Sequence, residues 1–139
     1  MDFSFIKLPK GIEMRQPYKG ELDYFNKNPK VAGMATEDGK VILNPYTGLK
    51  PEEYQSVATN EAARVLIKKD PSLKPDFELT ERQVSFLDSS TYRNASDEDR
   101  KSTIAARLLS GDPSAAPATS EQTIYVQTLK RRLMGDGQD

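Results

Sequence analysis

The 139-residue chain contains no cysteine and no histidine, and each absence excludes a class of chemistry. Without cysteine there is no disulfide framework, no thiolate nucleophile and no sulfur-ligated metal. Without histidine there is no imidazole general base, no Ser-His-Asp triad and almost none of the usual zinc sites. We therefore expect neither a metal nor another cofactor.

Long hydrophobic runs are missing as well. No apolar run approaches the roughly 20 residues that span a bilayer, and residues 1–7 are too short and too charged for a signal peptide. We expect no membrane span and synthesis inside the cell. The 20 basic and 21 acidic residues are interspersed and give a net charge of −1. No global field favours nucleic acid or an anionic membrane.

The composition is polar for a self-sufficient globule. Hydrophobic residues make up 36% and charged residues 29%, with a mean hydropathy of −0.69. This length suits a single domain. The polarity predicts ordered helices with extended arms, or burial that is completed against a partner.

Residues 1–30 show no helical periodicity and are interrupted by Pro9, Pro17 and Pro29. We predict an extended arm that packs either on its own domain or on a neighbouring subunit. Its apolar and aromatic residues are the candidates for partner contact, namely Phe3, Phe5, Leu8, Tyr18, Tyr24 and Phe25.

A β-hairpin is predicted at residues 31–44, where Asp38-Gly39 separates two apolar runs. An isolated two-stranded hairpin is marginal in water, so it must pack on the helices or gain another strand. Pro45 ends the second strand because it donates no ladder hydrogen bond. We assign Pro45 and Tyr46 a structural role.

Four helices are predicted after the hairpin, at about residues 50–69, 80–88, 96–110 and 120–134. Their starts carry capping signals, the clearest being the capping box formed by Thr80 and Gln83. Gly111 is placed to end the third of these helices. The predicted fold class is α+β, with a small β-hairpin and an extended N-terminal arm packed with about four helices. Residues 31–134 form one domain, and residues 135–139 form a flexible tail.

The first predicted helix carries Asn60, Glu61 and Arg64. With the strand and turn before it, residues 40–64 resemble the strand-turn-helix of compact zinc peptidases, whose helix carries His-Glu-x-x-His. Asn60 and Arg64 stand at the two histidine positions, and a permanently charged arginine repels a metal cation. We interpret Glu61 and Arg64 as an i,i+3 ion pair, with Asn60 in a structural role.

Two further constellations suggest activity. Glu61 could act as the acid of a peptidoglycan- or peptide-hydrolysing enzyme, with Glu37 or Asp38 as its second carboxylate. Lys130, Arg131 and Arg132 form a small basic cluster on the last helix, which could contact nucleic acid or simply complement the helix dipole. The balanced net charge favours the second interpretation of the cluster.

Four blocks of the sequence, taken in order, carry a wider resemblance. Residues 28–35, 41–46, 60–64 and 104–114 together are similar to small uncharacterised proteins of tailed bacteriophages. The resemblance spans more than half of the chain. It implies a phage origin, and small phage proteins without catalytic residues are often connector, tail or capsid accessory subunits.

Three functions follow as hypotheses. The first is a non-enzymatic virion structural or assembly subunit, made in the host bacterial cytoplasm, that contacts other virion proteins and self-assembles in a ring or shell through residues 1–30 and the last helix. The second is a hydrolase that uses Glu61, or its inactive remnant. The third is a soluble phage effector that binds a host protein.

Overall fold

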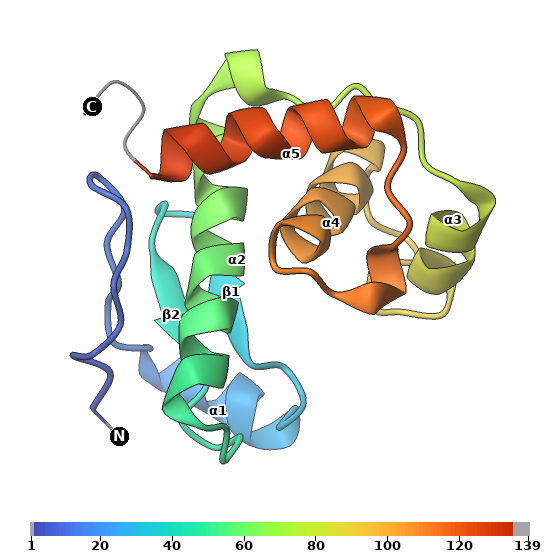
Figure 1. Cartoon of the computed structure of the whole chain (residues 1–139). Coiled ribbons are helices and arrows are strands. Elements are labelled where there is room, and N and C mark those ends of the chain that lie inside the picture. Colours follow the sequence, from blue (N-terminus) through green and yellow to red (C-terminus); the bar gives the residue numbers. More distant parts are fainter. Residues whose placement is uncertain (1, 135–139) are drawn as a thin grey trace. The chain divides into compact units, whose positions relative to one another are not determined.

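A computed structural model describes residues 2–134 of the chain (Figure 1). Within them it has five α-helices, two short 3-10 helices (η1 and η2) and one antiparallel hairpin, which confirms the α+β class. In chain order these elements are α1 (Lys19–Lys27), β1 (Gly33–Ala35), β2 (Val41–Leu43), α2 (Pro51–Lys69), η1 (Pro71–Leu73), α3 (Glu81–Asp88), α4 (Asp97–Leu109), η2 (Pro113–Ala115) and α5 (Ser120–Leu133).

The chain divides into two compact units, Met1–Val65 and Leu66–Asp139. The boundary falls within α2. This division differs from the predicted one, an arm of residues 1–30 followed by a domain of residues 31–134. The difference arises because the first 30 residues pack into the same unit as the hairpin. The predicted tail, residues 135–139, lies outside the described residues.

The predicted hairpin is present, with Met34 paired to Ile42 at its centre. Gly39 has φ 78°, the left-handed conformation that such a turn requires. Of the two predicted ways of supporting the hairpin, packing on a helix is observed, because Gly33 of β1 lies against Val57 of α2, while the sheet keeps two strands and gains a single isolated bridge. Met14 forms a parallel bridge to Val41, whose N–H donates to the Glu13 carbonyl at 3.0 Å.

The prediction that residues 1–30 are extended throughout is wrong, because Lys19–Lys27 form α1. Its first turn is closed by the carboxylate of Glu21, which accepts a 2.8 Å hydrogen bond from the Tyr18 N–H. Phe25 on this helix is fully buried, and Phe3 and Ile12 are 6% and 7% exposed. Of the two packing alternatives, these segments therefore pack within their own unit.

The core of the N-terminal unit forms around the first turns of α2. Tyr54 is fully buried, and its ring packs edge-on against the ring of Phe3, with 4.8 Å between centroids. Its hydroxyl donates to the Asn44 carbonyl at 2.6 Å and so fixes the turn between β2 and α2. Further along α2, Ala58 and Ala62 are fully buried as well.

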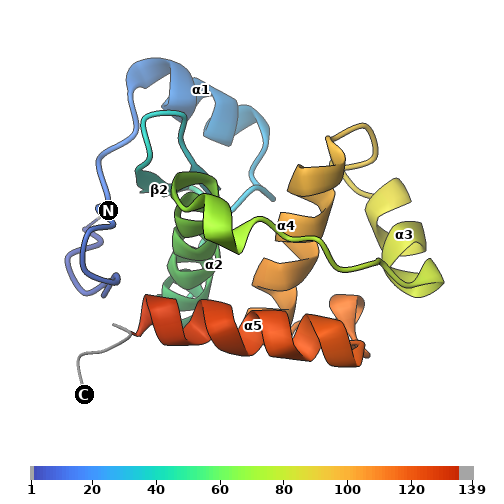
Figure 2. The ribbon, with the colours of Figure 1, turned by 90° about the horizontal axis from the view of Figure 1, so that it is seen from above.

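The C-terminal unit contains α3, α4 and α5, and α4 and α5 cross one another (Figures 1 and 2). The predicted capping box at Thr80 and Gln83 is confirmed, and α5 begins with a second one at Thr119 and Gln122. Ser96 caps α4, and Gly111 follows its end with φ 74°. These local signals therefore fix where the helices of this unit start and stop.

Candidate interaction site

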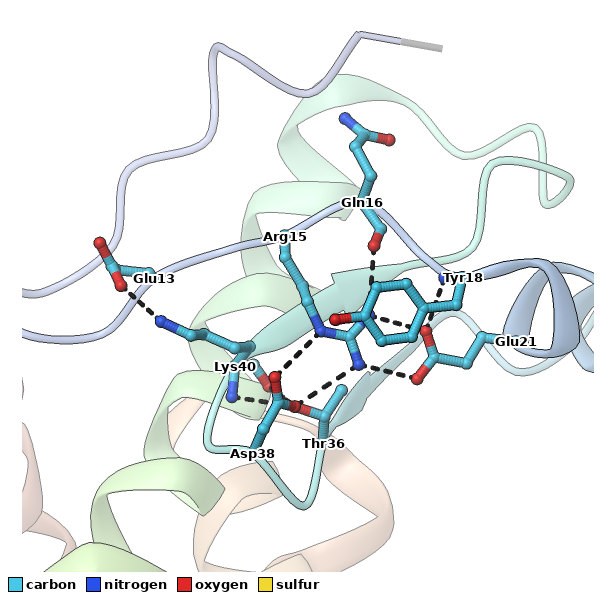
Figure 3. Close-up of polar contacts among 8 residues, drawn as sticks. All are labelled: Glu13, Arg15, Gln16, Tyr18, Glu21, Thr36, Asp38 and Lys40. Atoms are coloured by element: carbon cyan, nitrogen blue, oxygen red, sulfur yellow. Dashed lines mark hydrogen bonds and ion pairs between the residues drawn. The ribbon is translucent and has the colours of Figure 1, made fainter.

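Arg15 is the centre of a polar cluster in the N-terminal unit (Figure 3). Its guanidinium donates to both carboxylate oxygens of Glu21, at 2.7 and 2.9 Å, and to Asp38 at 3.2 Å. It also donates to the Gln16 carbonyl at 3.1 Å. The Arg15 side chain is only 17% exposed. One cation thus joins the start of α1 to the hairpin turn.

The electrostatics of this cluster favour a structural role. The hydrogen bond from Arg15 lowers the pKa of Glu21 from its ordinary value, and hydrogen bonds from Thr36 and then Arg15 lower the pKa of Asp38. Both carboxylates therefore stay ionised at neutral pH. A general acid at that pH needs a raised pKa, so this pair is suited to holding Arg15 and not to proton donation.

The cluster also positions an exposed aromatic ring. The guanidinium carbon of Arg15 lies 3.9 Å from the centroid of the Tyr18 ring, in cation–π geometry. Tyr18 is nevertheless 63% exposed. No other tyrosine or phenylalanine within residues 2–134 is as exposed. A ring fixed on one side and open on the other is preorganised for contact with a partner.

Two further tyrosines are exposed in the same unit, Tyr24 at 45% and Tyr46 at 49%. Asn44 connects the segments that carry them. Its side-chain N–H donates to the Val31 carbonyl at 2.7 Å and to the Phe25 carbonyl at 3.4 Å, and its side-chain oxygen accepts from the Tyr46 N–H at 2.8 Å. The buried Asn44 thus holds the turn of Tyr46 to the end of α1. We call Tyr18, Tyr24 and Tyr46 the exposed tyrosine group.

Some of the residues that the sequence proposed for partner contact are buried, and others are exposed. Phe3 and Phe25 are buried in the N-terminal unit, which corrects their assignment, because a residue in the core has no surface to offer. Leu8 is half-buried, whereas Phe5 is 40% exposed alongside Tyr18 and Tyr24.

Sequence reasoning missed Arg15 and assigned Tyr46 only to the turn. Arg15 contacts Asp38, 23 positions away, and no local pattern reports such a contact. The available local signal was Glu21, three residues after the N-cap Tyr18, where a capping box places the glutamate that accepts from the N-cap N–H.

The predicted ion pair of Glu61 and Arg64 is confirmed, with 3.7 Å between Arg64 Nε and the Glu61 carboxylate. Both side chains are largely buried, at 15% and 19% exposure. Within residues 2–134 no three acidic side chains gather in a manner that would hold a metal ion. Glu61 and Arg64 thus form an ion-paired face of α2.

The basic cluster lies in the C-terminal unit. Lys130, Arg131 and Arg132 are all exposed in the last turn of α5, and Arg132 forms an ion pair with Asp70. The charges of Lys130 and Arg131 face solvent.

No protein-family model matches the chain, and no curated protein or solved structure is significantly similar to it. None of the helices within residues 2–134 has both the length and the apolar character that crossing a bilayer requires.

Proposed function

We propose that the protein is a non-enzymatic assembly subunit of a tailed-phage particle, and that copies of the chain contact one another through the exposed tyrosine group. The observation that carries the proposal is Tyr18, an aromatic ring 63% exposed and stacked on an arginine that two carboxylates hold. Tyrosine and arginine are, with tryptophan, the residues most enriched at the energetic centres of protein interfaces.

The rigidity of this arrangement supports an interface over an incidental surface ring. An ordinary exposed tyrosine loses side-chain entropy when a partner immobilises it. Tyr18 has lost much of that freedom already, because Arg15 packs on its face and Glu21 fixes its backbone N–H. Contact with a partner therefore costs less free energy at Tyr18 than at an unrestrained residue.

The two other hypotheses have less support. Glu61 pairs with Arg64 at 3.7 Å on the face of α2, so its carboxylate already has a structural partner. A soluble effector requires a monomer that binds one host protein, and no feature of the described surface favours that partner over a second copy.

The test is the oligomeric state of the full-length chain, measured by mass photometry and by light scattering after size exclusion. The proposal predicts concentration-dependent assemblies larger than a monomer, together with the chain among the proteins of purified particles in mass spectrometry. A monomer at all accessible concentrations that is also missing from particles would contradict it. Hydrolysis of cell walls that Glu61→Gln abolishes would instead favour the enzyme.

A further inference from the structure

The ends of α2 and α5 are held together inside the C-terminal unit by contacts along the segment that follows α2. Arg132 forms an ion pair with Asp70 and donates to the Ser72 hydroxyl at 3.4 Å. Further along, the Tyr125 hydroxyl donates to the Leu73 carbonyl at 2.6 Å, and Gln122 donates to the Glu78 carbonyl at 2.8 Å. Residues 70–78 therefore run antiparallel to α5, and the two helix ends meet at Asp70.

This arrangement gathers positive charge from two parts of the sequence about 60 residues apart. We define the basic surface as six exposed cations, Lys68, Lys69, Lys74, Lys130, Arg131 and Arg132. Within residues 66–74 and 130–134, which the structure describes, Asp70 is the one acidic residue, and it is paired with Arg132. The basic surface thus has a strong local excess of positive charge in a chain whose net charge is −1.

The surface has an acidic boundary. Tyr125, two helical turns before Arg132, has a pKa raised by burial and then by the charges of Asp76 and Glu98. Those two carboxylates therefore lie within electrostatic range of the Tyr125 hydroxyl, and Asp76 follows Lys74 by two residues.

Complementing the helix dipoles explains only part of this pattern. Cations in the last turns of α2 and α5 are favourable for each helix by itself. Lys74, however, lies outside both helices, and the dipole effect does not require the two ends to meet. Exposed cations on two chain segments that the Arg132–Asp70 pair brings together instead match the spaced negative charges of a phosphate backbone.

We propose that the basic surface binds the phosphate backbone of double-stranded DNA without sequence preference. Lysine and arginine side chains on helix ends reach phosphate oxygens, and binding releases the counterions condensed on the duplex. This inference is independent of assembly through the tyrosines, since the two surfaces belong to different units.

The experiment is fluorescence anisotropy of a short labelled duplex of arbitrary sequence, titrated with the full-length chain at several salt concentrations. The variants are Lys68→Gln/Lys69→Gln and Lys130→Gln/Arg131→Gln, which leave the Arg132–Asp70 pair in place. The control is Lys10→Gln/Lys30→Gln, which removes the same charge from two exposed lysines of the N-terminal unit. Thermal melts verify that each variant is folded.

We expect micromolar or weaker binding that falls with salt and is equal for unrelated duplex sequences. Each basic-surface variant is expected to weaken binding and to lower the slope of log K against log salt by about 1 for each cation removed. The control is expected to keep the wild-type slope. Absence of binding at low salt, or an equal loss in the control and the two variants, would overturn the proposal.

Discussion

Arg15 and Tyr18 form a stacked pair in which the guanidinium carbon lies 3.9 Å from the ring centroid. The same guanidinium is held at its edges by Glu21 and Asp38 (Figure 3). The most exposed tyrosine ring of the described residues is thereby restrained on one face by an arginine that two carboxylates hold. Arg15 therefore serves both the packing of the N-terminal unit and the proposed interface at Tyr18. Substitutions of Arg15 test both roles.

Replacing Arg15 by methionine should destabilise the N-terminal unit by about 1–3 kcal/mol, because Glu21 and Asp38 are then left facing each other without their cation. Arg15→Lys should recover only part of the loss, since lysine cannot donate to Glu21 in the two-bond geometry of a guanidinium. Urea unfolding monitored by circular dichroism measures both. Equal stability of wild type and Arg15→Met would show that the cluster is not structural.

The ion pair of Arg15 and Glu21 also predicts a pH dependence. The pKa of Glu21 lies below its ordinary value of 4.5 in the folded protein, chiefly because of the hydrogen bond from Arg15. A lowered pKa stabilises the fold fully above the unfolded pKa, and this stabilisation disappears as the pH falls through the folded pKa.

The free energy of unfolding of wild type should therefore exceed that of Glu21→Gln near neutral pH, and the gap should narrow as the pH falls below about 4.5. Glu37→Gln, at an exposed position of the hairpin turn, controls for the loss of one charge. A gap that widens toward acid pH would contradict the assignment.

In the C-terminal unit, the side chains of Gln83 and Gln122 form two hydrogen bonds to each other, at 2.9 and 2.8 Å. Both are fully buried, and each also completes the capping box of its own helix. Gln83→Leu should lower the free energy of unfolding by about 2–4 kcal/mol. It removes the capping box of α3 and the two hydrogen bonds between the buried amides of Gln83 and Gln122.

The double variant Gln83→Leu/Gln122→Leu should cost less than the sum of the two single changes, since neither amide is then left unpaired. Thermal or urea unfolding gives the three values, with Gln127→Leu on the exposed face of α5 as control. Strict additivity would show that the two amides are not coupled.

The clusters around Arg15 and around Gln83 and Gln122 show which features could be predicted from the sequence. Helix starts at Thr80, Ser96 and Thr119 were predictable, because a cap acts over three residues and leaves a local pattern. The mutual bonding of Gln83 and Gln122 was not, because it joins helices 39 positions apart. Local patterns report caps and turns, whereas contacts between distant segments depend on packing.

The helix α1 was missed for a related reason. Pro17 and Gly20 near its start indicate a break, and the N-cap Tyr18 is outside the usual set of capping residues. What stabilises α1 comes from elsewhere, namely the burial of Phe25 and the bond between Arg15 and Glu21. The exposure of Tyr18 depends on the same contacts, so the candidate site was only partly visible in the sequence.

Gly33 tests the packing of the hairpin on α2. A Cβ atom there would lie 2.8 Å from Val57 Cγ1 and 3.1 Å from the Ile42 carbonyl oxygen. Gly33→Ala should therefore destabilise the protein by about 1–3 kcal/mol through overpacking. Gly20→Ala in α1 is the matched control, because a Cβ there meets nothing within 4 Å and alanine favours the helix.

Urea unfolding of Gly33→Ala and Gly20→Ala measures the two changes in the free energy of unfolding. Gly33→Ala/Val57→Ala should recover part of the loss if the clash with Val57 is its cause. A Gly33→Ala protein as stable as Gly20→Ala would mean that the hairpin does not pack tightly on the helix.

The proposed assembly depends most on whether the exposed tyrosine group mediates contact between copies. The direct measurement is sedimentation velocity of wild type, of Tyr18→Ser/Tyr24→Ser and of Ile124→Ser, an exposed apolar residue of the C-terminal unit that serves as control. We predict assemblies for wild type and Ile124→Ser and a folded monomer for the tyrosine variant. Assemblies of unchanged size and affinity in the tyrosine variant would contradict the proposed interface.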